Sequence, residues 1–167
     1  MIAKEDFDHE VKITELEIGD MAPDFLGVCN GNRKVALSDF KGKYLILYFY
    51  PKDSTSGCTK EAIAFTALQE KFAALDATII GVSKDSIKSH ETFIAKYDLN
   101  FNLVADKEME ICRNYYCWVE KSMYGRKYMG TQRATFIIDR NSKIAKIWRN
   151  VKVDGHAEEV LEALKSL

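Results

Sequence analysis

The sequence is poor in several features that mark whole classes of protein. Its 167 residues contain no C-x-x-C pair, only two prolines and three scattered histidines. Four cysteines are too few for the disulfide framework of a small secreted domain, and no Cys and His residues have zinc-ligand spacing. Charge is balanced as well, with 24 Lys and Arg against 25 Asp and Glu. We therefore expect no metal or cofactor and no nucleic-acid partner.

Long apolar runs are also missing. The run from Tyr44 to Tyr50 is far too short to span a bilayer, and the first ten residues, MIAKEDFDHE, lack the apolar centre of a secretory signal. These observations predict a soluble cytoplasmic protein that does not bind membranes. The chain length fits one domain, which we place at 13–167 after a loose tail at 1–12.

Apolar periodicity predicts an α/β protein. Buried strands are expected at 44–50 and 78–82, on either side of a helix with an apolar stripe from Ala62 to Leu75, which is the pattern of a right-handed parallel crossover. A second helix at 86–97, a strand at 101–105 and a short helix after Asp106 follow. Hairpins are expected at 25–37 and 134–148, a long connection at 117–132, and a last helix capped by Asp154. The elements together predict a mixed central sheet with helices on both faces.

Cys58 occupies the most informative position. Pro51 cannot continue a sheet ladder, and the turn-forming residues that follow it start a helix near Thr55–Cys58. A cysteine in the first helical turn meets unpaired backbone N–H groups and the positive end of the helix dipole, which favour the thiolate. Cys58 is therefore a candidate nucleophile.

The segment FYPKDSTSGCTKE resembles the active-site motif of peroxiredoxins, P-x-x-x-T-x-x-C. The longer stretch YFYPKDSTSGCTKEA is similar to the peroxiredoxin Q branch, also called bacterioferritin comigratory proteins. APDF, GVSKDS, LVAD and WVEKSMYGRKYMGTQRATFIID follow the order expected for that branch. The resemblance implies a thioredoxin-like fold with an N-terminal hairpin, and reduction of hydrogen peroxide and organic hydroperoxides by a thiol donor.

The same resemblance implies roles for five residues. Cys58 would attack the peroxide and become a sulfenic acid, while Thr55 and Arg133 would supply fixed donors for the departing oxygen. Arg133 would also keep Cys58 ionised. Pro51 would shield the pocket from water, and Glu61, one turn beyond Cys58, would orient Arg133.

The cysteine that resolves the sulfenic acid is missing from both usual places. One lies five residues after the first cysteine, where this chain has Ile63, and the other lies in the helix at 84–97, which has no cysteine. Either an external thiol such as thioredoxin, glutaredoxin or a small thiol reduces Cys58 directly, or Cys29, Cys112 or Cys117 takes part. Cys117, in a connection that looks flexible, is the best of the three, but we favour the one-cysteine route, in a monomer or weak dimer.

Two other function classes share the predicted fold. A thiol-disulfide oxidoreductase of the thioredoxin type needs a second thiol in C-x-x-C, which Cys58-Thr59-Lys60-Glu61 does not provide. A non-enzymatic interaction domain would have no reason to keep Thr55, Cys58 and Arg133 together. Peroxide consumption with dithiothreitol, compared between the parent and Cys58→Ser, separates these classes.

Overall fold

The computed structural model of the chain describes residues 15–167. The loose tail predicted at 1–12 lies outside the described residues. The main element of residues 15–167 is a mixed sheet of seven strands in the order β2-β1-β5-β4-β3-β8-β9. The strands are β1 (Leu26–Cys29), β2 (Arg33–Ala36), β3 (Tyr44–Phe49), β4 (Ala77–Ser83), β5 (Asn102–Ala105), β8 (Ala134–Ile138) and β9 (Ile144–Arg149).

Strand β3 lies at the centre because it is apolar on both faces. It pairs in parallel with β4 and antiparallel with β8. Successive side chains of a strand point to opposite faces, and both faces of β3 are buried. Leu45, Leu47 and Phe49 pack in one core, and the residues between them pack in the other. The buried strand predicted at 44–50 is confirmed within one residue of its end.

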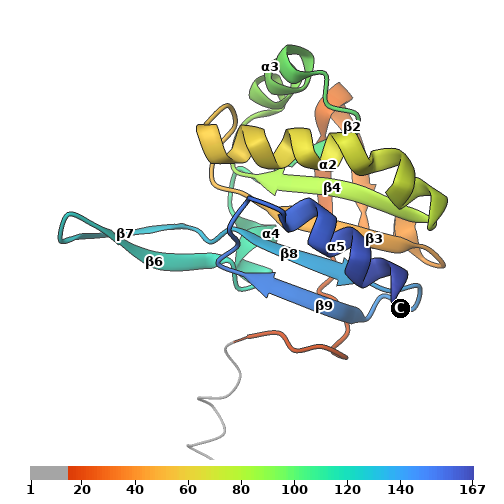
Figure 1. The fold of residues 1–167 in the computed structure, drawn as a ribbon. Helices are drawn as coiled ribbons and strands as arrows, with labels where there is room; N and C mark the ends of the chain where they lie inside the picture. Colours follow the sequence, from red (N-terminus) through yellow and green to blue (C-terminus); the bar gives the residue numbers. More distant parts are fainter. Residues whose placement is uncertain (1–14) are drawn as a thin grey trace, which may run out of the picture.

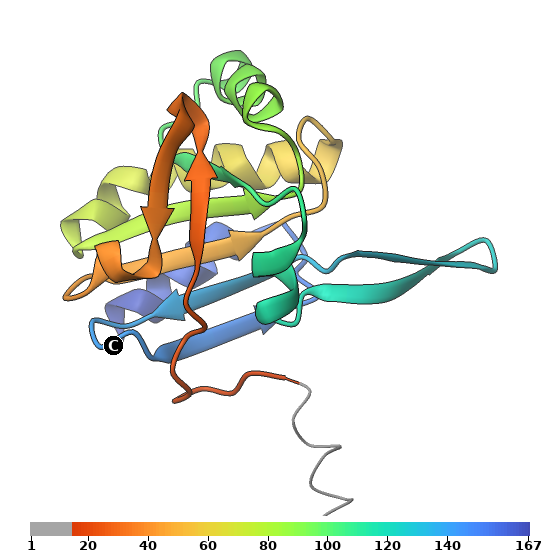
Figure 2. The ribbon, with the colours of Figure 1, turned by 180° about the vertical axis from the view of Figure 1, so that it is seen from behind.

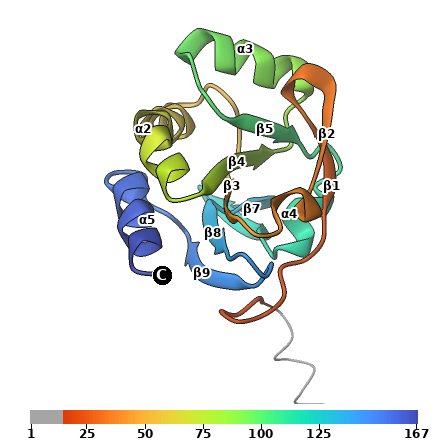
Figure 3. The ribbon, with the colours of Figure 1, turned by 90° about the vertical axis from the view of Figure 1, so that its right-hand side faces the viewer.

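Helices cover both faces of this sheet, as predicted (Figure 3). On one face α2 (Ser56–Ala74), α3 (Ile87–Tyr97) and α5 (His156–Lys165) bury apolar side chains in one core. The short helix α4 (Glu110–Asn114) and the residues before β1 pack on the other face, which Figure 2 shows from behind. Short 3-10 helices, η1 (Asn30–Asn32) and η2 (Leu37–Phe40), follow β1 and β2. Within residues 15–167, no helix is long and apolar enough to cross a membrane.

The long connection predicted at 117–132 is wrong, because these residues form a hairpin. Strands β6 (Trp118–Met123) and β7 (Arg126–Thr131) pair antiparallel and project from the domain (Figure 1). Tyr124 and Gly125 join them, both with positive φ, as a tight two-residue hairpin turn requires. The strands are mostly exposed on both faces, so they lack the alternation of apolar and polar residues by which a strand is recognised.

The start of the last helix also differs from the prediction. Gly155, not Asp154, is the residue before α5, and no side chain caps the helix there. Asp154 instead makes an exposed ion pair with Lys60 at 3.3 Å. The apolar face of α5 is buried as expected, except at Leu167, which is 49% exposed beyond the helix end.

His156 gives the fold a pH-dependent stability. It is 3% exposed, its Nε2 lies 2.8 Å from Thr135 Oγ1, and burial lowers its pKa to about 4. The folded protein therefore binds the proton less well than the unfolded chain, so this contribution is complete above pH 6.5 and is lost as pH falls toward 4. We expect His156→Phe to reduce the loss of unfolding free energy between pH 7 and pH 5 by about 2 kcal/mol. Urea unfolding of both proteins at both pH values checks this; equal losses would contradict it.

Candidate active site

Cys58 is the third residue of α2 and is 2% exposed. Thr55 precedes the helix with extended backbone, and its carbonyl accepts the first helical hydrogen bond, from Thr59 N at 2.8 Å. The N–H groups of the three residues between them therefore lie outside the helical ladder, at the positive end of the helix dipole. This is the position that the sequence predicts for Cys58.

Arg133 reaches Cys58 from the connection between β7 and β8. Its Nη2 donates to Cys58 Sγ at 3.4 Å, and its Nη1 donates to Glu61 Oε1 at 2.6 Å. The Arg133 side chain is 17% exposed and that of Glu61 1%. Three residues separated by up to 75 positions in the sequence thus meet at one point, as the resemblance implied.

Glu61 is held in a largely water-free position. Burial raises its pKa to about 7, although the nearby Arg133 guanidinium acts in the opposite direction. Its Oε1 receives the Arg133 hydrogen bond, while Oε2 is buried without a partner among the described residues. A carboxylate at this distance from the guanidinium fixes the direction of the Arg133 side chain.

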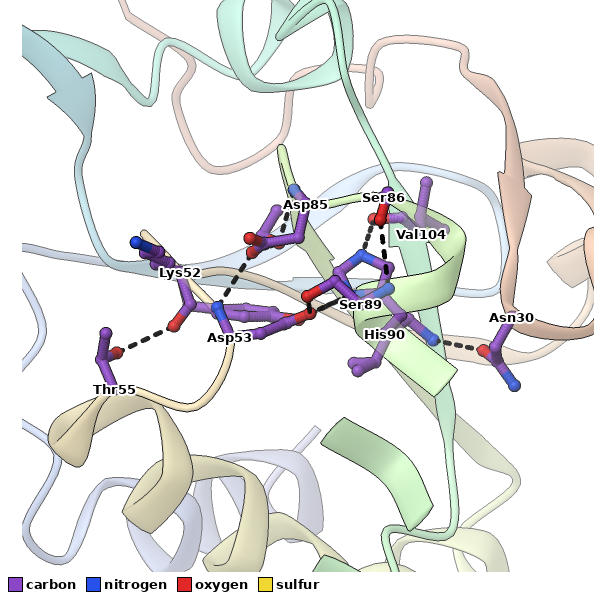
Figure 4. A network of polar contacts seen from close by, with 12 residues as sticks. Asn30, Lys52, Asp53, Thr55, Asp85, Ser86, Ser89, His90 and Val104 are labelled. Carbon is purple, nitrogen blue, oxygen red and sulfur yellow. Dashed lines mark hydrogen bonds and ion pairs between the residues drawn. The ribbon is translucent and has the colours of Figure 1, made fainter. Parts of the chain in front are cut away.

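Thr55 points its hydroxyl in a direction that the sequence did not predict. Its Oγ1 donates to the Lys52 carbonyl at 2.8 Å (Figure 4). A hydroxyl has one hydrogen, so in this arrangement Thr55 can only accept a hydrogen bond from a substrate. The expectation that Thr55 donates to the departing oxygen does not fit this geometry, whereas acceptance of a peroxide O–H does.

The other three cysteines pack in one core, whereas Cys58 packs in the core on the opposite face of the sheet. Cys29, Cys112 and Cys117 are at most 3% exposed, and all four cysteines are free thiols. Burial raises the pKa of Cys112 to about 11 and that of Cys117 to about 12, so both are poor nucleophiles at neutral pH. Cys117 was expected in a flexible connection, but it is completely buried. Pro51 is half-buried, lies two residues after the end of β3 at Phe49, and opens the loop to Thr55.

Gly57 adjoins the site, and the sequence reasoning missed it. A Cβ placed on it would lie 3.2 Å from Arg133 Nη2, the atom that contacts Cys58. The absent side chain therefore leaves room for the guanidinium. In the sequence, the only indication of this position is that a glycine stands in the first turn of the predicted helix, where alanine is the better helix former.

We expect Gly57→Ala to slow the reaction of Cys58 with peroxide about 10-fold, because the added methyl displaces the guanidinium by a few tenths of an ångström. The thermal midpoint should stay equal or rise, since alanine favours the helix. Stopped-flow oxidation and a melting curve measure the two effects. An unchanged oxidation rate would contradict this role of Gly57.

A polar cluster lies behind the loop. Asp53, Asp85 and His90 place ligand-type atoms within 4.8 Å of one another. These atoms are already occupied: Asp53 Oδ2 is 2.7 Å from His90 Nδ1, Asp85 Oδ2 accepts from Asp53 N, and His90 Nε2 lies 2.9 Å from the Val104 carbonyl. The cluster is therefore a hydrogen-bonded network and not an open metal site.

Comparisons with known proteins identify the family of this chain. Residues 18–147 match the model of the AhpC/TSA family. Peroxiredoxin Bcp of Bacillus subtilis is 47% identical over 152 residues, covering 91% of this chain and 97% of its own. A protein of Coxiella burnetii described as a peroxiredoxin bcp is 44% identical over 149 residues, covering 89% and 99%.

Solved structures give the same result. Bacterioferritin comigratory protein of Xanthomonas campestris, described for its alkyl peroxide reduction activity, superposes with a TM-score of 0.84 at 42% identity, covering 90% of this chain and 96% of its own. A cysteine variant of peroxiredoxin Q from Xylella fastidiosa superposes with a TM-score of 0.87 at 40% identity, covering 91% and 97%. The chain therefore belongs to the AhpC/TSA family of peroxiredoxins and, within it, to the peroxiredoxin Q or Bcp branch.

Proposed function

We propose that Cys58 is the peroxidatic residue of this thiol-dependent peroxidase, which reduces hydrogen peroxide and organic hydroperoxides. The contact between Arg133 Nη2 and Cys58 Sγ, 3.4 Å long at the start of α2, carries the proposal. The guanidinium and the helix N-terminus both favour negative charge on the sulfur. The alkyl peroxide activity described for the Xanthomonas campestris protein supports the substrate class.

The first chemical step uses groups that the site already orients. The Cys58 thiolate attacks the nearer peroxide oxygen, the O–O bond breaks, and the sulfur becomes a sulfenic acid. The departing oxygen leaves as water or an alcohol after it takes up a proton. Arg133 stabilises the charge that develops on the oxygens, and Thr55 Oγ1 accepts the peroxide O–H.

An external thiol completes the cycle in this proposal. One thiol condenses with the sulfenic acid, giving a mixed disulfide and water, and a second thiol releases Cys58 as the mixed disulfide is reduced. The sum is one peroxide and two thiols converted to water or alcohol, a disulfide and water. The burial of Cys29, Cys112 and Cys117 and the presence of Ile63 in place of a cysteine support this route.

Thioredoxin, glutaredoxin or a small thiol is the proposed reductant. Four free thiols are typical of proteins in a reducing compartment, which supports a cytoplasmic location. We propose a monomer or weak dimer as the working form, because Cys58, Arg133 and Glu61 all come from one chain.

The experiment is peroxide consumption coupled to NADPH oxidation through thioredoxin or glutaredoxin and their reductases, with dithiothreitol as a separate donor. We expect turnover with at least one donor. Absence of turnover with all of them, in a folded and reduced protein, would overturn the proposed function.

The recycling route predicts a particular oxidised product. After one equivalent of peroxide without reductant, peptide mapping should find Cys58 as sulfenic or sulfinic acid and the other three cysteines as thiols. A stoichiometric disulfide between Cys58 and Cys29, Cys112 or Cys117 would replace the one-cysteine route with an internal one. That result would leave the peroxidase activity itself unaffected.

A further inference from the structure

A buried network holds the Lys52–Asp53 segment immediately before the active-site turn (Figure 4). The Asp53 carboxylate accepts from the Tyr50 hydroxyl at 2.7 Å and from the Ser89 hydroxyl at 2.8 Å, and His90 Nδ1 is 2.7 Å away. His90 is in turn fixed on the Val104 carbonyl of β5 at 2.9 Å. Asp53 is 6% exposed and His90 is fully buried. Residues of α3 and β5 therefore fix one side chain of the loop.

The backbone of the same residue is fixed by Asp85. Its Oδ2 accepts from Asp53 N at 2.9 Å and from the Ser83 hydroxyl at 2.7 Å. The Asp53 N–H belongs to the same peptide unit as the Lys52 carbonyl, and in a trans peptide the two groups point in opposite directions. By holding the N–H, Asp85 therefore aims the Lys52 carbonyl the other way, at Thr55 Oγ1.

The loop needs this support because its backbone is strained. Ser54, between Asp53 and Thr55, has φ of 64°, a left-handed conformation that costs a non-glycine residue free energy. Without outside contacts, the segment would relax toward ordinary backbone angles. The Lys52 carbonyl and the Thr55 hydroxyl would then lose their alignment.

We propose that Asp85, together with Asp53, is a positioning residue for peroxide reduction. Asp85 orients the Lys52–Asp53 peptide so that the Lys52 carbonyl accepts a hydrogen bond from the Thr55 hydroxyl. The oxygen of that hydroxyl then faces the peroxide as an acceptor. Asp85 touches no reacting atom in this scheme and acts through the peptide and Thr55. The inference rests on the proposed function, in which Thr55 contacts the peroxide.

The test compares matched variants in a single turnover. Asp85→Ala removes the acceptor for Asp53 N–H, whereas Asp85→Asn keeps one oxygen that can accept it. Thr55→Val removes the hydroxyl and keeps the branched shape, and the double variant Asp85→Ala/Thr55→Val completes a double-mutant cycle.

Ser86→Ala is the control for α3, because it removes only the N-cap contact with Ser89 N. The readouts are the rate constant of Cys58 with hydrogen peroxide and its alkylation rate with iodoacetamide.

We expect Asp85→Ala to lower the peroxide rate constant about 10-fold and Thr55→Val about 10- to 100-fold, which are typical losses for an oriented hydrogen-bonding group. The double variant should match Thr55→Val within about twofold, because Asp85 acts only through Thr55. Asp85→Asn and Ser86→Ala should stay near the parent. Alkylation, which needs no peroxide acceptor, should be equal in all of them.

Three results would overturn the inference. They are a parent-like peroxide rate in Asp85→Ala, losses that multiply in the double variant, and an alkylation rate that falls as much as the peroxide rate. A parent protein that does not react with peroxide at all would instead refute the proposed function, so the two failures are distinguishable.

Discussion

Replacing Cys58 by serine should reduce peroxide consumption to the rate measured without the protein. A serine hydroxyl has almost the size of the thiol, but it is not ionised at neutral pH and does not form the sulfenic intermediate. The loss should appear with every thiol donor, because the first chemical step is abolished. Peroxide remaining over time, with dithiothreitol as donor, is the direct measurement.

Alanine variants of the other three cysteines are the matched controls. Cys29, Cys112 and Cys117 are buried and, in the proposed route, take no part in turnover. Each variant should keep turnover with dithiothreitol within a few-fold of the parent, provided that it folds. A serine variant of Cys58 with parental turnover would exclude Cys58 as the peroxidatic residue.

Replacing Arg133 by alanine should lower the rate constant for peroxide about 10²- to 10³-fold, which is the usual cost of removing one fixed donor from such a site. The guanidinium contacts the sulfur at 3.4 Å and is the only group given a role toward both the thiolate and the departing oxygen. Arg133→Lys should recover only part of the rate. A lysine ammonium has one nitrogen, whereas Arg133 contacts Glu61 through Nη1 and Cys58 through Nη2. Stopped-flow oxidation of Cys58 measures all three proteins.

Lys60 provides the control for charge alone. It lies two residues after Cys58 but is 65% exposed and paired with Asp154, so Lys60→Ala should change the rate by less than about twofold. If Arg133→Ala changed the rate constant no more than Lys60→Ala does, the contact between Arg133 and Cys58 would not contribute to catalysis.

The parts of the fold that could be predicted are those with apolar periodicity. Strand β3 is buried on both faces and appears in the sequence as a continuous apolar run. Helix α2 is buried on one face and appears as an apolar stripe at helical spacing. The β6–β7 hairpin could not be recognised in this way, because backbone pairing and the turn at Tyr124–Gly125 hold it and few of its side chains are buried.

The site residues likewise fall into those that the local sequence predicts and those that it does not. Local sequence places Cys58 at a helix start, since loop and helix are neighbours along the chain. Arg133 came only from the family resemblance, because no local pattern links it to a residue 75 positions away. The roles of Asp53, Asp85 and His90 were not predicted, since they depend on how α3 and β5 pack against the loop. The direction of the Thr55 hydroxyl is likewise a property of the folded loop.

The most direct test is to locate the oxidised sulfur. The reduced protein is mixed with one equivalent of hydrogen peroxide in the presence of dimedone, which traps sulfenic acids, and the labelled peptides are identified by mass spectrometry. We predict a dimedone adduct on Cys58 and none on Cys29, Cys112 or Cys117. An adduct on one of those three, with Cys58 recovered as an unmodified thiol, would contradict the central claim.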